Sequence, residues 1–234
     1  MNCSDKITRE QLCRMFDHTN LKAYADKEML QTLCEEAKEN HCAMVAINSS
    51  PVSYCKELLK DTDIHVGAAI SFPLGQTTVA AKVFEAQNAI ENGADEIDYV
   101  INIGELKNKN YQYIESEMKA MVELCRSNNV ISKVIFEICY LTEDEIKKVS
   151  EIAKKVKPDY IKTSTGFGTS GAVKEIVRLM KDCVGKDVKV KAAGGIRSWK
   201  TCAEMIDAGA ERIGTSSTIK ILQEFDEVRA GKSI

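Results

Sequence analysis

Two stretches of the chain share one design: Asp159-Tyr160-Ile161-Lys162-Thr163-Ser164-Thr165-Gly166-Phe167 and, further along, Val188-Lys189-Val190-Lys191-Ala192-Ala193-Gly194-Gly195-Ile196-Arg197. Each is a short apolar run that carries a lysine near its end and then turns at glycine. Lysine is almost never fully buried without a partner, because removing an ammonium group from water is costly and lowers its pKa. A neutral amine attacks carbonyl groups. The two stretches therefore predict two buried strands whose lysines are suited to imine chemistry.

The alternation of an apolar run with a helix-patterned segment repeats along the whole chain. Eight short runs are closer to apolar runs than to clean alternations of apolar and polar residues, which is typical of parallel strands covered by helices. They are residues 17–21, 43–48, 65–72, 96–102, 132–139, 160–164, 188–193 and 212–216. Between them lie amphipathic segments at 27–40, 77–92, 111–127, 142–157, 172–184 and 199–208. Thr142 with Glu145 has the spacing of a capping box and marks one helix start.

The number and spacing of these units predict an α/β fold, the (β/α)₈ or TIM barrel. Eight strands recur about every 25 to 30 residues, which is the length of one βα unit. A doubly wound open sheet of about five to seven strands is the alternative. Because no linker tract divides the 234 residues, we expect a single domain over 1–234. Within it we expect a short extra N-terminal helix at about 7–16, the barrel at about 17–222 and a C-terminal tail at 223–234.

The composition excludes several classes of protein. A net charge of −3 and a pI of about 5.8 argue against a general nucleic-acid-binding surface. No apolar stretch approaches the roughly 20 residues that span a bilayer. The first ten residues, Met-Asn-Cys-Ser-Asp-Lys-Ile-Thr-Arg-Glu, lack the apolar segment of a signal peptide. We expect a cytoplasmic enzyme that binds neither nucleic acid nor a membrane.

The cysteines and histidines show no metal or disulfide pattern. The nine cysteines are scattered and contain no C-x-x-C pair, which argues against a disulfide framework and a structural zinc site. Most lie inside apolar patterns and are expected to pack as small core residues. A single catalytic cysteine remains an alternative that no motif favours. His18, His41 and His65 lack metal-ligand spacing, so we expect no metal.

Five polar side chains fall at the carboxyl ends of predicted strands, where the active sites of such barrels lie. They are Asp98, Lys133, Glu137, Lys162 and Lys191. The last two are 29 residues apart, so adjacent strands place them side by side. Like charges at short distance disfavour joint protonation. The pair therefore predicts one amine that is neutral at working pH.

Each of these residues also has a structural interpretation. Asp98 and Lys133 could form an ion pair inside the barrel. Lys162 alone could bind a phosphate, and because Lys189 alternates with Lys191, one of the two should face the helices. The two lysines occur as a pair, one followed by Thr163-Ser164 and the other by Gly194-Gly195. As a pair they favour a functional interpretation.

Glycine-rich turns after three consecutive strands predict a phosphate site. They are Gly166-Phe167-Gly168-Thr169-Ser170-Gly171, Gly194-Gly195-Ile196-Arg197 and Gly214-Thr215-Ser216-Ser217. The loops after strands seven and eight of a barrel often hold phosphate with backbone amides and a helix N-terminus. Ordinary turn chemistry explains many single loops of this kind. Three in succession favour a small phosphorylated substrate.

These segments closely resemble the deoxyribose-phosphate aldolase family. The resemblance rests on Lys162-Thr163-Ser164-Thr165-Gly166-Phe167, Lys191-Ala192-Ala193-Gly194-Gly195-Ile196-Arg197, Gly214-Thr215-Ser216-Ser217 and Asp95-Glu96-Ile97-Asp98. Asp17-His18-Thr19-Asn20-Leu21-Lys22 and Gly67-Ala68-Ala69-Ile70-Ser71-Phe72-Pro73-Leu74-Gly75 add to it. It extends from about residue 10 to residue 222.

The resemblance implies a class I aldolase that cleaves 2-deoxy-D-ribose 5-phosphate to D-glyceraldehyde 3-phosphate and acetaldehyde, without a metal or organic cofactor. It implies that Lys162 forms the Schiff base, while Asp98 and Lys191 transfer protons. The implied phosphate ligands are Gly166, Gly194, Gly195, Gly214, Ser216 and Ser217. The implied partner is a small phosphorylated sugar, and a homodimer is the assembly to test.

Three positions depart from the family pattern. Ala46 stands where many members have a cysteine, and Asn20 stands where leucine is usual. Phe167 stands where some members have a lysine, so the phosphate is expected to rely more on backbone amides and on Arg197. Two other functions remain open from the residues alone. One is an imine-forming phosphosugar aldolase with a different substrate, and the other is a non-catalytic phosphometabolite-binding barrel.

Overall fold

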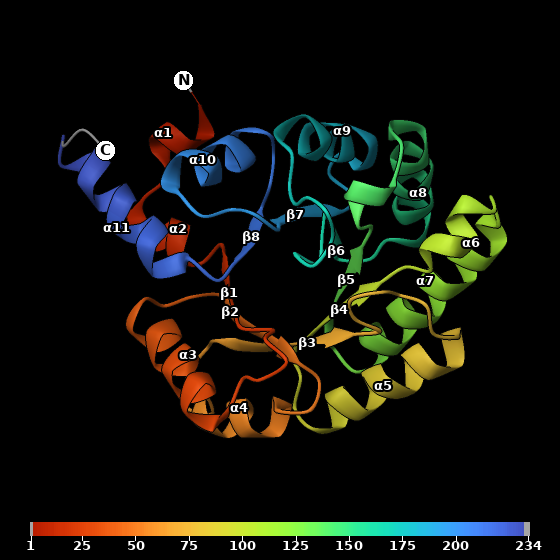
Figure 1. The fold of residues 1–234 in the computed structure, drawn as a ribbon, viewed down its shortest axis with the longest axis horizontal. Coiled ribbons are helices and arrows are strands. Elements are labelled where there is room, and N and C mark those ends of the chain that lie inside the picture. The colour runs from red at the N-terminus through yellow and green to blue at the C-terminus, as the bar shows by residue number, and fades with distance from the viewer. Residues whose placement is uncertain (1, 232–234) are drawn as a thin grey trace.

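Eight parallel strands close into a barrel, which confirms the predicted fold and excludes the open sheet (Figure 1). A computed structural model describes residues 2–231. The strands are β1 Phe16–Thr19, β2 Met44–Asn48, β3 His65–Ile70, β4 Glu96–Val100, β5 Ile131–Ile135, β6 Tyr160–Lys162, β7 Lys189–Ala193 and β8 Arg212–Thr215. They follow one another in chain order, and β8 pairs with β1 to complete the ring.

The helices surround this ring (Figure 1). They are α1 Cys3–Lys6, α2 Arg9–Cys13, α3 Lys27–Glu39, α4 Val52–Leu58, α5 Val79–Glu91, α6 Ile103–Lys107, α7 Tyr111–Ser127, α8 Glu143–Val156, α9 Lys174–Val184, α10 Trp199–Asp207 and α11 Thr218–Arg229, with a 3₁₀ turn at Ile138–Tyr140. Most of the hydrophobic core lies between the strands and these helices. No helix within residues 2–231 is long and apolar enough to cross a membrane.

Both ends of the chain differ from the prediction. The expected helix at 7–16 is shorter, with only α2 inside this range, because Thr8 caps its start by accepting a hydrogen bond from the backbone N–H of Gln11. A separate short helix, α1, precedes it. Of the expected tail at 223–234, residues up to Arg229 continue α11. Phe225 is buried there, and its ring meets the edge of Trp199 at 4.8 Å between centroids. Burial of an aromatic ring is a large stabilising contribution, so this segment stays helical. Residues 232–234 lie outside the described residues.

The register of the strands brings the predicted polar residues together. Lys162 on β6 is aligned with Lys191 on β7, and Asp98 on β4 is aligned with Lys133 on β5. Side chains of a strand alternate between its two faces, so these four residues share the interior of the barrel. Lys189 has the same parity, but it lies at the amino end of β7 and is exposed. The expectation that one of Lys189 and Lys191 would face the helices is therefore wrong, because residues two apart on a strand lie on the same face.

A buried ion pair fixes the end of β4 from outside the barrel. Lys82 of α5 and Glu117 of α7 are fully buried, and their Nζ and Oε1 atoms lie 2.6 Å apart. Lys82 Nζ also donates to the carbonyl oxygen of Val100 at 2.7 Å. The second carboxylate oxygen of Glu117 accepts from the backbone N–H of Asn102 at 3.0 Å. The pair thus anchors the segment that leaves β4 just beyond Asp98.

Replacing Lys82 with methionine should lower the free energy of unfolding by about 3–5 kcal/mol, because it leaves the carboxylate of Glu117 buried without its partner. Chemical denaturation monitored by circular dichroism measures the change. The double variant Lys82→Met, Glu117→Leu should recover part of the loss, since no unpaired charge remains. Lys148→Met, which breaks an exposed pair with Glu151, is the control and should change little. A Lys82→Met variant as stable as the wild type would contradict the structural role of the pair.

Candidate active site

A cavity of about 440 Å³ opens at the carboxyl ends of the strands. Its walls come chiefly from α3 and from the loops after β1, β6, β7 and β8, with Lys162 among the lining residues. The other lining residues are His18, Thr19, Asn20, Leu21, Lys22, Met29, Thr32, Leu33, Glu36, Ala46, Thr165, Gly166, Phe167, Ala193, Gly194, Gly195, Ile196, Arg197, Gly214, Thr215 and Ser216. Within residues 2–231 no three His, Cys, Asp or Glu side chains gather in a metal-binding arrangement.

Asp98 connects the two lysines that the sequence singled out. Its Oδ2 atom lies 2.8 Å from Nζ of Lys162 and 2.6 Å from Nζ of Lys191. Its Oδ1 atom lies 2.6 Å from Nζ of Lys133. All four side chains are almost completely buried. The predicted catalytic trio is therefore one contiguous group, and the predicted pairing of Asp98 with Lys133 is also present.

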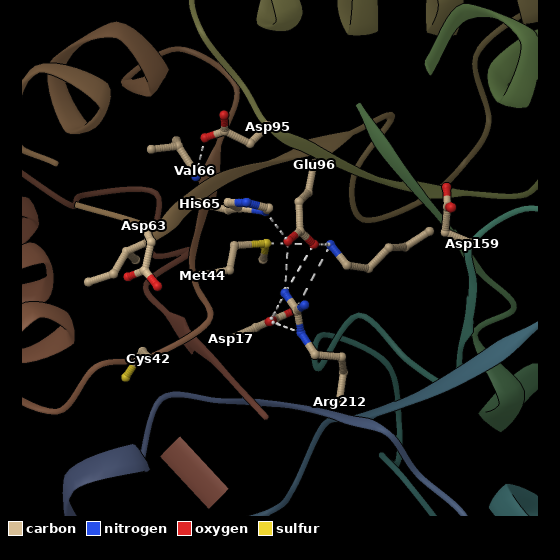
Figure 2. A network of polar contacts seen from close by, with 12 residues as sticks. Asp17, Cys42, Met44, Asp63, His65, Val66, Asp95, Glu96, Asp159 and Arg212 are labelled. Carbon is tan, nitrogen blue, oxygen red and sulfur yellow. Dashed lines mark hydrogen bonds and ion pairs between the residues drawn. The ribbon is translucent and has the colours of Figure 1, made fainter. Parts of the chain in front are cut away.

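A larger set of charges continues below this group toward the amino ends of the strands. We call the six residues Asp17, Glu96, Asp98, Lys133, Lys191 and Arg212 the interior charge cluster. Figure 2 shows its lower part, with the carboxylate of Glu96 between the imidazole of His65 and the guanidinium of Arg212, beside Asp17. Arg212 reaches Asp17 at 2.6 Å and Glu96 at 3.0 Å. Lys191 also contacts Asp17, and Lys133 also contacts Glu96.

The charges of the cluster balance without Lys162. Three carboxylates face three cations, and each of those cations contacts at least two of the carboxylates. Among the described residues, Asp98 is the one carboxylate in ion-pair contact with Lys162, and it is already shared. Burial alone would raise the pKa of Asp98, but the ammonium groups around it hold that pKa well below its usual range.

Of the three lysines around Asp98, Lys162 has the fewest carboxylate partners. Burial lowers the pKa of Lys162 to about 8, and the neighbouring charges of Lys191 and Lys133 act in the same direction against the attraction of Asp98. The opposite holds for Lys133, where Asp98 and Glu96 outweigh the effect of burial and raise the pKa. At neutral pH a useful fraction of the Lys162 side chain is therefore neutral and nucleophilic.

An aromatic ring stands beside the same amine. The Nζ atom of Lys162 lies 5.7 Å from the ring centroid of Phe72, and the ring of Phe167 meets Phe72 edge-on at 5.7 Å between centroids. Phe167 lines the cavity and is more than half exposed. The position that is a lysine in some relatives of the resembled family is thus an apolar surface here. A ring face next to the amine stabilises a cation formed on that nitrogen.

Five of the six residues expected to bind phosphate line the cavity. They are Gly166, Gly194, Gly195, Gly214 and Ser216. Ser217 does not line it, and its backbone N–H donates to Oγ1 of Thr215 at 2.9 Å. The loop after β6 is built in the same way, with the backbone N–H of Phe167 donating to Oγ1 of Thr165 at 3.0 Å.

Two of these glycines are required by close approach or by conformation. A Cβ atom at Gly214 would lie 2.9 Å from Cβ of Ala193 and 3.0 Å from Cε of Lys191, so a larger residue would displace that lysine. Gly194 has φ +89°, in the left-handed region that favours glycine. Its carbonyl oxygen accepts from the backbone N–H of Ala172 at 3.0 Å. This contact ties the loops after β6 and β7 together.

Sequence reasoning did not single out several parts of the site. Asp17, Glu96 and Arg212 were not assigned roles, because their inward parity on predicted strands does not distinguish them from the exposed Lys189. Glu137 was expected at the site, but it does not line the cavity. It is buried, and its carboxylate accepts from the backbone N–H and the hydroxyl of Thr165. Glu137 therefore shapes the loop after β6.

The fold and the site define a barrel enzyme with a buried lysine of lowered pKa, which faces a cavity at the carboxyl ends of the strands. Comparison with known proteins identifies the family. The sequence profile of the DeoC/LacD family aldolases matches residues 12–224. The deoxyribose-phosphate aldolase of Lactobacillus acidophilus is 59% identical over 218 residues, which cover 93% of this chain and 92% of that protein. The chain belongs to the DeoC/LacD family of aldolases.

Other relatives agree. The deoxyribose-phosphate aldolase of Thermococcus kodakarensis is 48% identical over 219 residues, covering 93% of this chain and 98% of that protein. The crystal structure of a tetrameric deoxyribose phosphate aldolase from Aeropyrum pernix superposes with a TM-score of 0.89 at 28% identity. That superposition covers 96% of this chain and 95% of the other. The chain is therefore an aldolase by sequence and by fold.

The lowered pKa of Lys162 predicts how imine formation depends on pH. Only the neutral amine attacks, so the rate of imine formation with acetaldehyde should rise with pH and level off above a midpoint near 8. Samples quenched in borohydride at one fixed pH and weighed by mass spectrometry give this rate. Lys191→Met should move the midpoint to higher pH, because the loss of a like charge favours the ammonium form of Lys162.

The exposed residue Lys200, which does not line the cavity, provides the control. Lys200→Met should leave the midpoint where it is in the wild type. A midpoint in Lys191→Met that is unchanged or lower would show that Lys191 does not depress the pKa of Lys162.

Proposed function

We propose that this chain is a class I aldolase that reversibly cleaves 2-deoxy-D-ribose 5-phosphate to D-glyceraldehyde 3-phosphate and acetaldehyde, in deoxyribose phosphate catabolism. The observation that carries the proposal is the buried Lys162 amine, with a pKa near 8, in a cavity whose walls hold the glycine-rich loops. Relatives up to 59% identical bear the name of this activity. In this cavity the aldehyde group of the substrate would react with the Lys162 amine, while its phosphate group would bind to the glycine-rich loops.

The first step joins the substrate to Lys162. The neutral amine attacks the C1 aldehyde of the open-chain sugar, and loss of water gives a protonated imine. Phe72 stabilises this cation through its ring face. The positive nitrogen then accepts electrons from the bond that breaks. The lowered pKa of Lys162 serves the earlier attack, because only the neutral amine is a nucleophile.

Bond cleavage requires removal of the proton from the C3 hydroxyl group. The C2–C3 bond breaks, its electrons enter the imine to form an enamine, and glyceraldehyde 3-phosphate leaves. Because the pKa of Asp98 is far below its usual range, this carboxylate does not retain a proton. We infer that it passes the proton on through water, and that the ammonium group of the adjacent Lys191 takes this proton up only as it releases its own toward the enamine. The enamine is then protonated at C2, and water releases acetaldehyde from Lys162.

The phosphate group orients the small reacting end of the substrate. Backbone N–H groups of Gly166, Gly194, Gly195 and Gly214, with Ser216, are the proposed ligands, and Ser217 completes the N-terminal end of α11. Binding energy from a remote group is used to position C1 near the amine. Intrinsically flexible glycines allow the backbone to approach the anion closely.

We also propose a cytoplasmic location. The assembly that we propose is a homodimer. All nine cysteines are free, which suits a reducing compartment. One related aldolase is a tetramer, so measurement of the mass in solution by light scattering decides between these assemblies. The partner molecule is the phosphorylated sugar.

A coupled assay that detects acetaldehyde tests the proposed activity. The wild type should release acetaldehyde from 2-deoxyribose 5-phosphate and should remain active in EDTA. Lys191→Leu should lower kcat by about 10²–10⁴, the usual contribution of a positioned acid–base group, and should still bind the phosphosugar in a calorimetric titration. Lys200→Leu is the matched control.

Absence of acetaldehyde release by the folded wild type would refute the proposed substrate. Turnover at the wild-type rate in Lys191→Leu would remove Lys191 from the mechanism. Loss of activity in EDTA that a divalent metal restores would refute the metal-independent route.

A further inference from the structure

We propose that Lys22, on the loop after β1, is a second cation for the substrate phosphate and thereby selects phosphorylated over unphosphorylated sugars, with Asn20 as its positioning residue. This inference rests on the proposed function. Lys22 lies outside the three loops expected to hold the phosphate, and it lines the same cavity.

The closure of the barrel places this loop beside the phosphate loops. Strand β1 pairs with β8, and the register aligns Asp17 with Gly214 and His18 with Thr215. The segment 19–22 therefore leaves the sheet next to the turn that carries Ser216. In the order of the barrel the loops after β7, β8 and β1 are consecutive. Arg197 on the loop after β7 and Lys22 on the loop after β1 therefore flank the loop after β8, and both can contact one anion bound there.

The backbone around Lys22 is held in a defined turn. The side-chain Oδ1 of Asn20 accepts a hydrogen bond from the backbone N–H of Lys22 at 3.3 Å, as in an Asx-turn. The carbonyl oxygen of Lys22 accepts from the backbone N–H of Ala25 at 3.0 Å. The backbone N–H of Asn20 donates to the carbonyl oxygen of Ala46 on β2 at 3.0 Å. The loop is thereby fixed to the sheet while the side chain of Lys22 is exposed.

The distribution of charge on the cavity wall favours an anion near Lys22. Three basic side chains of lysine or arginine line the cavity, namely Lys22, Lys162 and Arg197. Neither Lys22 nor Arg197 forms an ion pair with any residue in the part of the chain that the structure describes. Glu36 is the one acidic residue among those lining the cavity within 2–231, and it pairs with His18 at 2.7 Å.

The charge of the substrate favours a second cation beside Arg197 and the backbone amides. A phosphate monoester carries a charge of about −1.5 to −2 at pH 7, which one guanidinium group does not neutralise. Lys162 cannot supply the missing charge, because it must be neutral to attack the aldehyde. Phe167, on the loop after β6, supplies none. The Nζ atom of Lys22 lies 5.6 Å from the exposed ring of Tyr24, a weak contact that a phosphate would readily replace.

The test compares two substrates in one variant. Lys22→Met should lower kcat/KM for 2-deoxyribose 5-phosphate by about tenfold or more, mainly through KM, as expected for the loss of a hydrogen bond to a charged group. The same variant should keep kcat/KM for unphosphorylated 2-deoxyribose within about twofold of the wild type. Inhibition by inorganic phosphate should weaken in parallel. Asn20→Leu should show the same pattern with a smaller loss, and Lys22→Arg should retain most of the activity.

Lys186→Met is the matched control. Lys186 lines a separate hollow at the amino ends of the strands, with Lys157 and Lys189, and its loss should alter neither substrate. An equal loss for both substrates in Lys22→Met would overturn the inference, because it would indicate a general role of the loop. No loss for either substrate would overturn it as well. A wild type that fails to cleave the phosphosugar at all would instead refute the proposed function.

Discussion

The carboxylate of Asp98 is in contact with three lysines. The rest of the site depends on how many other carboxylates each of these lysines contacts. Lys133 and Lys191 each contact a second carboxylate, of Glu96 and Asp17 respectively. In the described chain Lys162 contacts Asp98 alone. Buried charges are stable only when they are paired. Lys162, the amine with the fewest carboxylate partners, has a lowered pKa, and among these lysines it is the one that lines the cavity.

The ion pairs of the interior charge cluster depend on closure of the barrel. The members of the interior charge cluster come from β1, β4, β5, β7 and β8, and an open sheet would leave the first and last strands apart. The pairing of β1 with β8 brings Asp17 to Arg212 and Lys191. The absence of a side chain at Gly214 leaves the room that Lys191 occupies. Fold and pKa are thus linked, because the closed ring buries Lys162 and holds Lys191 beside it, and both effects lower the pKa of Lys162.

The sequence predicted the parts of the site that local pattern and strand spacing determine. Lys162 and Lys191 are one βα unit apart, so their alignment followed from the fold alone, and it is confirmed. Asp17, Glu96 and Arg212 were not recognised, because a charge at the first residues of a strand resembles an exposed end. Whether such a charge is buried depends on partners that lie on other strands, from one to four strands away around the ring. Lys189, which is exposed, and Arg212, which is not, could not be told apart from the sequence.

The differences in secondary structure have the same origin. Helix α4 has only Val52 and Cys55 as buried residues, too few for a recognisable helical period. Helix α11 continues through Phe225 because Trp199 of the preceding helix packs against it, a contact that local sequence does not reveal.

Ser217 was expected with the phosphate ligands, but its N–H is directed to Thr215.

Peptide mapping after borohydride reduction in the presence of 2-deoxyribose 5-phosphate shows directly which amine forms the imine. A single covalent adduct on Lys162 is the predicted result, with Lys133 and Lys191 unmodified because each is paired with at least two carboxylates. An adduct on either of those lysines, or no adduct in an active preparation, would contradict the assignment of Lys162 as the neutral amine.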